Sequence, residues 1–299
     1  MLYVVSAYLL WGLFPAYFPL LAAASPYEII AHRIVWTAVI MLVIISLTGT
    51  ARRLREIDRT TWGWLSFASI AIALNWLIYV IAVNSGHVAD AALGYFINPL
   101  VNVLFGIIFL KERLRFLETI SIGIAVLAVV FLTVLAGEPP IIALSLAFSF
   151  GTYGLIKKKI NLPASLTLTA ETLVLTPCAL AAIGYLEYSG QGSFASVGPH
   201  HSALLIATGV ITAVPLLLFG KGARMIPLST VGMLQYMTPT MQLLWAVFVV
   251  NESVDSWKWM GFILIWIAVA IYMSDTLIRA TRSHRSHRSH RTNRRRVER

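Results

Sequence analysis

The chain has 299 residues, of which 58% are hydrophobic and only 12% are charged, and its mean hydropathy is +0.79. A soluble domain carries about 25% charged residues, so this composition excludes an ordinary soluble protein and predicts an integral membrane protein. The net charge of +10 would suggest nucleic acid binding in a soluble protein, but its distribution along the chain argues against it. The single cysteine, Cys178, excludes an intrachain disulfide and a multi-cysteine metal site.

Apolar runs divide the chain into ten predicted transmembrane helices. A helix needs about 20 apolar residues to cross roughly 30 Å of hydrocarbon. The sixth and eighth runs are short and contain Gly or Pro, which is typical of spans that line a cavity in transporters. The runs lie at residues 2–21, 28–47, 62–83, 89–110, 117–135, 141–156, 165–185, 203–219, 230–250 and 257–274.

The basic residues lie on one side of these spans. All but two of the 23 Lys and Arg fall in alternate loops or in the C-terminal tail; the exceptions are Arg33 and Lys258. By the positive-inside rule, both termini and the basic loops are cytoplasmic. The tail, residues 277–299, repeats Arg-Ser-His and offers little apolar surface to bury. We therefore expect a disordered cytoplasmic segment that adheres to anionic lipid.

Two segments 140 residues apart match without a gap. Residues 94–116 and 234–256 each place a proline thirteen residues before a glutamate, and only the first ends in basic residues. Each copy contains five spans. Because five is an odd number, the second of two tandem copies starts on the opposite side of the membrane and is inverted relative to the first. We predict an all-α integral membrane fold of ten transmembrane helices in two inverted five-helix repeats, residues 1–137 and 141–275. Such repeats are typical of secondary transporters, with a site near the midplane, although duplication also yields bundles without transport.

Polar side chains form matched stripes on the fourth and ninth predicted helices. Tyr95, Asn98 and Asn102 are spaced to share one helical face. Each of them has a polar counterpart 140 residues further along the chain, at the equivalent position of the second matching segment. Two matched stripes favour the lining of a cavity on the repeat axis, and the alternative is hydrogen bonding between packed helices. The partners are Gln235, Thr238 and Gln242.

Two charged residues lie inside the predicted spans at repeat-equivalent positions. Arg33 and Glu171 are each about 9–10 Å deep from opposite ends, within joint reach. Intramembrane charges mark functional sites, so we predict a charged centre with Glu171 as a candidate proton carrier. The alternative is a structural pair or side chains that reach back to the surface. The candidate substrate-binding residues are Arg33, Asn75, Tyr79, Tyr95, Asn98, Asn102, Glu171, Gln235 and Gln242.

The run from Asn75 to Asn84, followed by Gly94–Asn102, resembles the RarD branch of the EamA family, in the drug/metabolite transporter superfamily. The resemblance covers nearly the whole chain. It implies a ten-helix protein of the bacterial inner membrane, with two inverted halves, that exports or exchanges a small molecule. Further matching motifs are Trp11-Gly12, His32-Arg33, Glu171-Thr172, Pro215-Leu216-Leu217 and Gln235-Tyr236.

Taken together, these patterns predict a secondary transporter of a small metabolite or drug-like molecule that works by alternating access. A proton gradient or a solute gradient would drive it, since no Walker pattern indicates ATP. The spans contain no HExxH, GxSxG or paired Asp, so we expect no enzyme activity, metal or cofactor. The expected partners are the substrate and the lipid bilayer, not nucleic acid. The alternative is a non-transporting membrane scaffold or receptor.

Overall fold

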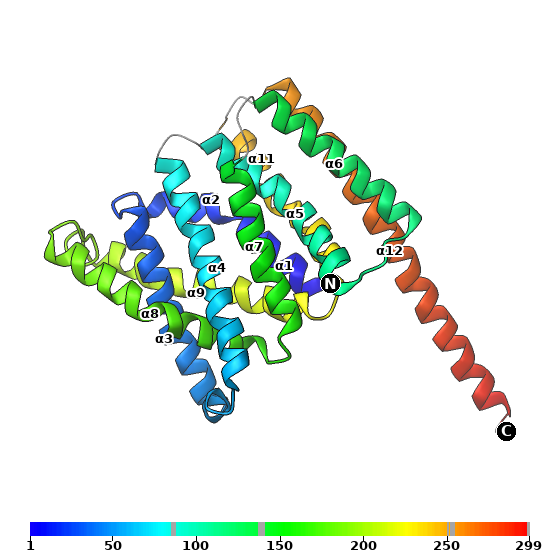
Figure 1. The fold of residues 1–299 in the computed structure, drawn as a ribbon, viewed down its shortest axis with the longest axis horizontal. Coiled ribbons are helices and arrows are strands. Elements are labelled where there is room, and N and C mark those ends of the chain that lie inside the picture. Colours follow the sequence, from blue (N-terminus) through cyan, green and yellow to red (C-terminus); the bar gives the residue numbers. More distant parts are fainter. Residues whose placement is uncertain (85–87, 137–140, 250, 252–254, 298–299) are drawn as a thin grey trace. The chain divides into compact units, whose positions relative to one another are not determined.

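A computed structural model describes the backbone of residues 1–84, 88–136, 141–249, 251 and 255–297. Within these ranges all regular elements are helical (Figure 1). The elements are α1 (Leu2–Gly12), α2 (Phe14–Tyr17), η1 (Phe18–Leu21), α3 (Pro26–Leu47), η2 (Ala51–Leu54), α4 (Arg59–Asn84), α5 (Val88–Leu110), α6 (Phe116–Ala136), α7 (Ile141–Lys159), α8 (Ala164–Tyr188), α9 (Pro199–Ala223), α10 (Leu228–Gln235), α11 (Met237–Phe248) and α12 (Ser256–Val297).

Eight helical segments among the described residues are long and apolar enough to cross a membrane. The fourth and ninth predicted spans are not among them, because the described apolar part of α5 is short (Gly94–Leu110) and the ninth is broken into α10 and α11. The structure therefore supports the predicted multi-pass membrane protein, but it does not confirm the predicted number of ten spans. The eight are Leu2–Leu21, Pro26–Leu47, Arg59–Tyr79, Phe116–Leu135, Ile141–Lys159, Ala164–Tyr188, Pro199–Ala223 and Ser256–Asp275.

The chain forms two compact units. The first combines Met1–Glu112 with Ala136–Ser253, and the second combines Arg113–Leu135 with Val254–Arg299. In the second unit α6 and α12 run side by side (Figure 1), where Gly261 lies against the Leu132 side chain. The backbone of α12 is described as helical to Val297. The tail lacks Gly and Pro and is rich in Arg, a good helix former.

In the first unit, helices from the two halves of the sequence interleave. Helix α3 packs against α8 and α9, and α4 packs against α7 and α8. Helix α1 packs against α9 and α11, and α5 packs against α7 and α10. Small residues allow the closest crossings: a Cβ on Gly209 would lie 2.6 Å from Trp36 Cβ, and one on Gly232 would lie 2.5 Å from the Pro99 carbonyl oxygen. Packing through small residues is the usual means of helix association in membranes.

Proline interrupts the two broken spans. The first span ends its α-helix at Gly12, just before Pro15, and continues through α2 and η1. The ninth breaks at Tyr236 because Pro239 has no N–H to donate to the carbonyl of Gln235, one turn earlier. Its predicted counterpart, Pro99, leaves α5 as one continuous helix. The two repeat-related prolines therefore act differently on their helices.

Glu112 links the end of α5 to the start of α10. Its carboxylate accepts hydrogen bonds from the backbone N–H groups of Leu228, at 2.6 Å, and Ser229, at 3.0 Å, and from the Ser229 hydroxyl at 2.7 Å. A carboxylate at a helix N-terminus satisfies unpaired N–H groups and complements the helix dipole. The matching residue, Glu252, lies outside the described residues.

Candidate functional site

A lysine and a glutamate form a buried ion pair between α7 and α8. Nζ of Lys157 lies 2.8 Å from Oε1 of Glu171 and donates a second hydrogen bond, of 2.7 Å, to the hydroxyl of Thr167. The hydroxyl of Tyr153 donates to the other carboxylate oxygen at 3.2 Å. Lys157 is 3% exposed and Glu171 is 2% exposed. Such a pair is stable only when its remaining polar positions are also hydrogen-bonded, and here both partners have a second contact.

Arg33 has partners other than the predicted one. Its Nε donates to Oγ1 of Thr212 at 3.0 Å, and its guanidinium lies over the ring of Trp76, 4.5 Å from the centroid. The hypothesis that Arg33 and Glu171 form the charged centre of a site stays a prediction, but the ion pair of Glu171 is with Lys157. The reason is that α7 extends three residues beyond the predicted sixth span, which carries Lys157 into the packed interior.

Arg33 and Glu171 nevertheless border the same small cavity. Its volume is about 20 Å³, room for roughly one water molecule. Its walls come from α3 and α4 in the first half of the sequence and from α7, α8 and α9 in the second. Charged residues from both halves of the sequence thus border one small cavity. The lining residues are Arg33, Ile34, Thr37, Ile72, Trp76, Tyr153, Leu168, Glu171, Thr172, Leu175, Thr212 and Leu216.

The predicted amide residues bond between helices. Nδ2 of Asn102 donates to Oε1 of Gln235 at 3.0 Å and joins α5 to α10. Nδ2 of Asn75 donates to the carbonyl of Leu146 on α7 at 2.8 Å. Both amides are buried. These bonds fit the helix-packing alternative for the polar stripes, and they do not place the stripes along one common cavity.

The other predicted site residues are spread over α4, α5 and α11. The rings of Tyr79 and Tyr95 meet edge to face with centroids 6.0 Å apart. Asn98 is 3% exposed, and its Oδ1 has no hydrogen-bond donor among the described residues. Gln242 is partly buried on α11. A buried carbonyl oxygen without a donor is unusual; Oδ1 of Asn102 is in the same situation, so both Asn98 and Asn102 have an oxygen that could accept a further hydrogen bond.

Aromatic rings surround Phe219 beside the ion pair. Tyr153 stacks on Phe219 with centroids 6.1 Å apart and an interplanar angle of 14°. Trp11 and Phe150 approach the same ring at 5.6 Å and 5.7 Å. Since Tyr153 also donates to Glu171, flat apolar faces and a carboxylate are neighbours.

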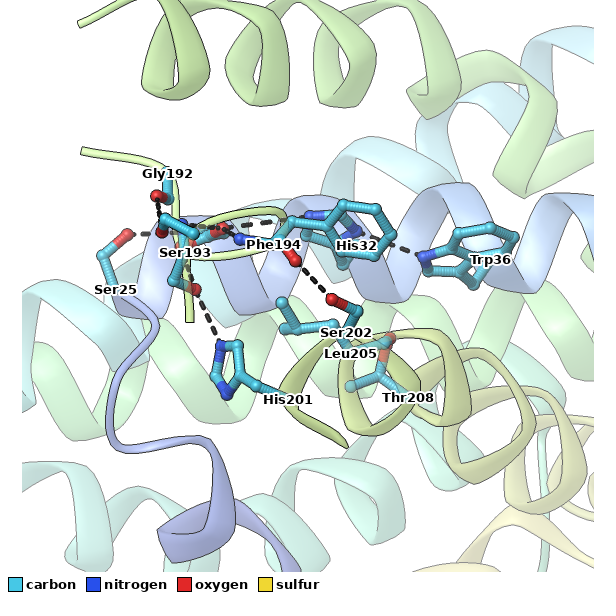
Figure 2. Close-up of polar contacts among 12 residues, drawn as sticks. Ser25, His32, Trp36, Gly192, Ser193, Phe194, His201, Ser202, Leu205 and Thr208 are labelled. Carbon is cyan, nitrogen blue, oxygen red and sulfur yellow. Dashed lines mark hydrogen bonds and ion pairs between the residues drawn. The ribbon is translucent and has the colours of Figure 1, made fainter. Parts of the chain in front are cut away.

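A second buried carboxylate, that of Glu28, ties the loop between α8 and α9 to α3; Figure 2 shows the loop residues Ser193 and Phe194. Glu28 is 1% exposed and accepts hydrogen bonds from the backbone N–H groups of Ser193, at 2.7 Å, and Phe194, at 3.1 Å, and from the Ser193 hydroxyl at 2.9 Å. Sequence reasoning missed this role. The signal was Ser25-x-x-Glu28, a capping box, in which Ser25 accepts from the Glu28 N–H at 3.2 Å; the carboxylate binds the loop instead.

Histidines extend this cluster in Figure 2. The ring of His32 stacks on Phe194, with centroids 4.7 Å apart, and its Nδ1 accepts a hydrogen bond of 3.2 Å from Trp36. Nε2 of His201, on α9, lies 2.8 Å from the Ser193 hydroxyl oxygen. The loop is therefore fastened to both α3 and α9, and Phe194 covers the side of His32.

These features define a polytopic helical membrane protein with charged groups buried between its two halves. The chain belongs to the EamA-like transporter family, whose model matches residues 1–134 and 139–274, and within it to the RarD branch. Protein RarD of Streptomyces exfoliatus is 44% identical, over 95% of this chain and 90% of that protein. The uncharacterized transporter YojE of Bacillus subtilis is 42% identical, over 95% and 97%.

Two further comparisons agree with this assignment. Protein RarD of Escherichia coli is 39% identical, over 94% of this chain and 96% of that protein. A solved crystal structure aligns with a TM-score of 0.71, at 17% identity, over 91% of this chain and 96% of that chain. At that identity the alignment supports the fold alone. The resemblance inferred from the sequence motifs is thus confirmed at the level of family and branch.

Proposed function

We propose that the protein is a secondary transporter that moves a small metabolite or drug-like molecule by alternating access, in the direction of export or exchange. The observation that carries this proposal is the small cavity between the two halves of the sequence, with Arg33 supplied by α3 and Glu171 by α8. Transport needs a site that both halves contribute, since their relative movement then exposes it to one side at a time.

Paired helix contacts support a structural repeat of the first half in the second, and the loop charges support its inversion. If residues 141–275 repeat residues 1–137, then α3 corresponds to α8, α4 to α9, and α5 to α10 and α11. The contact of α3 with α9 then mirrors that of α8 with α4, and the contact of α4 with α7 mirrors that of α9 with α1. Likewise the contact of α5 with α7 mirrors the contact of α11 with α1. The contacts of α3 with α8 and of α5 with α10 each join two corresponding helices, so each is its own counterpart. We infer ten membrane-spanning segments, with the interrupted pair α10 and α11 acting as one.

The size of the cavity implies movement. Pockets that hold drug-sized ligands measure about 300–1,000 Å³, and the space beside Arg33 and Glu171 is about 20 Å³. Substrate binding would therefore require the halves to separate. We propose that the Glu28 cluster is a contact that opens in this step, because it joins α3 of the first half to the loop and helix of the second.

Glu171 remains the candidate proton carrier. It lies in the cavity wall, and both of its carboxylate oxygens have a partner that can donate a proton or a hydrogen bond. Protonation of Glu171 would weaken its attraction to Lys157 and free the ammonium group to move. A proton could then couple to the opening of the cavity. The basic loops favour an inner-membrane protein with both termini cytoplasmic.

Flux measurements in proteoliposomes test the proposal. Uptake or counterflow is followed over a panel of amino acids, aromatic drugs and small metabolites, with and without a pH gradient. We expect at least one compound to move faster than in empty vesicles, and we expect Glu171→Gln to abolish the response to the gradient. The matched control is Glu56→Gln, an exposed carboxylate in a loop, which should leave flux unchanged. No specific flux over the panel would favour a membrane scaffold or receptor.

A further inference from the structure

A basic cavity lies at the end of the first unit that carries the loop between α7 and α8. Its volume is about 810 Å³, within the range of small-molecule pockets. The end of α7, the loop, the first turn of α8 and the last turns of α9 form its walls. Lys158, Lys159, Lys221 and Arg224 border it, and no Asp or Glu is among its described lining residues. The cavity is thus suited to an anion.

Two of these cations hold the cavity wall in place. Arg224 donates to the carbonyl oxygen of Leu162 and, at 2.8 Å, to Oδ1 of Asn161. Lys158 donates to the carbonyl oxygen of Ile226. These bonds connect the segment after α9 to the end of α7 and to the loop that precedes α8. Arg224 and Lys158 therefore fix the shape of the cavity and add positive potential to it.

The other two cations have hydrogen-bond donors to spare. Nζ of Lys221 lies 4.3 Å from the ring centroid of Tyr3, and Nζ of Lys159 lies 5.8 Å from that of Phe109. Both lysines are exposed, and within the described ranges neither forms an ion pair with a carboxylate. An aromatic face offsets only part of an ammonium's hydration. Lys159 and Lys221 are consequently the residues available to a ligand.

The first turn of α8 adds to the positive potential. Pro163, Ala164 and Ser165 line the cavity, and no side chain caps the N-terminus of this 25-residue helix. Its first N–H groups lack intrahelical acceptors, and the helix dipole favours an anion at this end. Ammonium groups together with a helix N-terminus are the usual means of binding phosphate.

We propose that this cavity binds a phosphate group at the cytoplasmic surface, carried by an anionic phospholipid headgroup or by a soluble phosphate ester. The charge of the loops places this end of the protein in the cytoplasm, and anionic lipids lie in that leaflet. Apolar side chains in the wall, Ile160, Leu217 and Met225, favour the lipid, which brings glycerol and acyl carbons with its phosphate. The proposal does not rest on transport.

Lipid binding by the purified full-length protein tests it. Retention of added lipid in native mass spectra and the shift in melting temperature are measured with phosphatidylglycerol, phosphatidylcholine and glycerol 3-phosphate as probes. We expect phosphatidylglycerol to bind and stabilise. In the double variant Lys159→Gln/Lys221→Gln its apparent affinity should fall roughly thirtyfold. The charge-matched control is Arg53→Gln/Arg55→Gln, which removes two exposed arginines from another basic loop and should stay within about twofold.

The outcomes distinguish a phospholipid headgroup from a soluble phosphate ester as the source of the bound phosphate. Binding of phosphatidylglycerol alone supports the headgroup, and equal stabilisation by glycerol 3-phosphate assigns the site to a soluble ester. Equal losses in the two double variants, or no preference for phosphatidylglycerol over phosphatidylcholine, would overturn the proposal in favour of general surface charge. Lys159→Arg/Lys221→Arg should retain binding, which separates loss of charge from loss of folding.

Discussion

The ion pair of Lys157 and Glu171 yields the most decisive prediction. Lys157→Met leaves the Glu171 carboxylate with only the Tyr153 hydroxyl as a side-chain donor, and Glu171→Leu leaves the ammonium of Lys157 without a countercharge. Each change strands a buried charge, so each should lower the free energy of unfolding by about 3–5 kcal/mol. The double variant Lys157→Met/Glu171→Leu removes both charges and should lie within about 2 kcal/mol of the parent.

A double-mutant cycle measures this coupling. Unfolding of the purified protein in mixed micelles gives the four free energies, from which we expect a coupling energy of at least about 3 kcal/mol. Flux in proteoliposomes is measured in parallel, and the stable double variant should not respond to a pH gradient. Additive single effects, or single losses below about 1 kcal/mol, would show that the pair is solvated and that the argument from burial is wrong.

Other changes test the packing, the loop and the topology. Gly232→Ala, whose Cβ would lie 2.5 Å from a carbonyl oxygen of α5, should cost about 1–3 kcal/mol of stability; in thermal denaturation the control Gly123→Ala, with no atom within 4 Å of its Cβ, should be neutral or stabilising. Glu28→Ala removes three hydrogen bonds from the α8–α9 loop, so hydrogen exchange of that loop should accelerate about tenfold or more; an unchanged rate would contradict its role as a fastening. Cysteines placed at Arg113 and at Ser253, in a Cys178→Ala background, should react with impermeant reagents from opposite sides of the membrane, and labelling from one side would refute the inversion.

Most helices could be predicted from the apolar runs alone. The second predicted span, 28–47, differs from α3 (Pro26–Leu47) by two residues, because a bilayer fixes the length of the apolar stretch. The break at Tyr236 was harder, since proline lowers helix stability without determining whether the helix bends or stops. Pro99 and Pro239 show both outcomes in matching sequence contexts.

The site could be predicted only in part. Glu171 and Arg33 were identified because charges are rare in spans, and both border the central cavity. Lys157 was missed because it begins a run of three lysines, which reads as a cytoplasmic loop. Its position four residues after Tyr153 puts the two on one helical face, and Thr167 and Glu171 repeat that spacing on α8. Facing pairs of this kind become apparent only when the helices are known to be neighbours.

The contact between Gly232 and Pro99 has a mechanical consequence. The Pro99 carbonyl oxygen occupies the space that a Cβ on Gly232 would need, and the Asn102–Gln235 hydrogen bond joins the same two helices close by. We therefore expect α5 and α10 to pivot about this crossing if the two halves move. From Pro99 to the end of α5 is eleven residues, or about 16 Å, so a tilt of about 10° would displace that end by about 3 Å. Glu112, just beyond it, would carry this displacement to the start of α10.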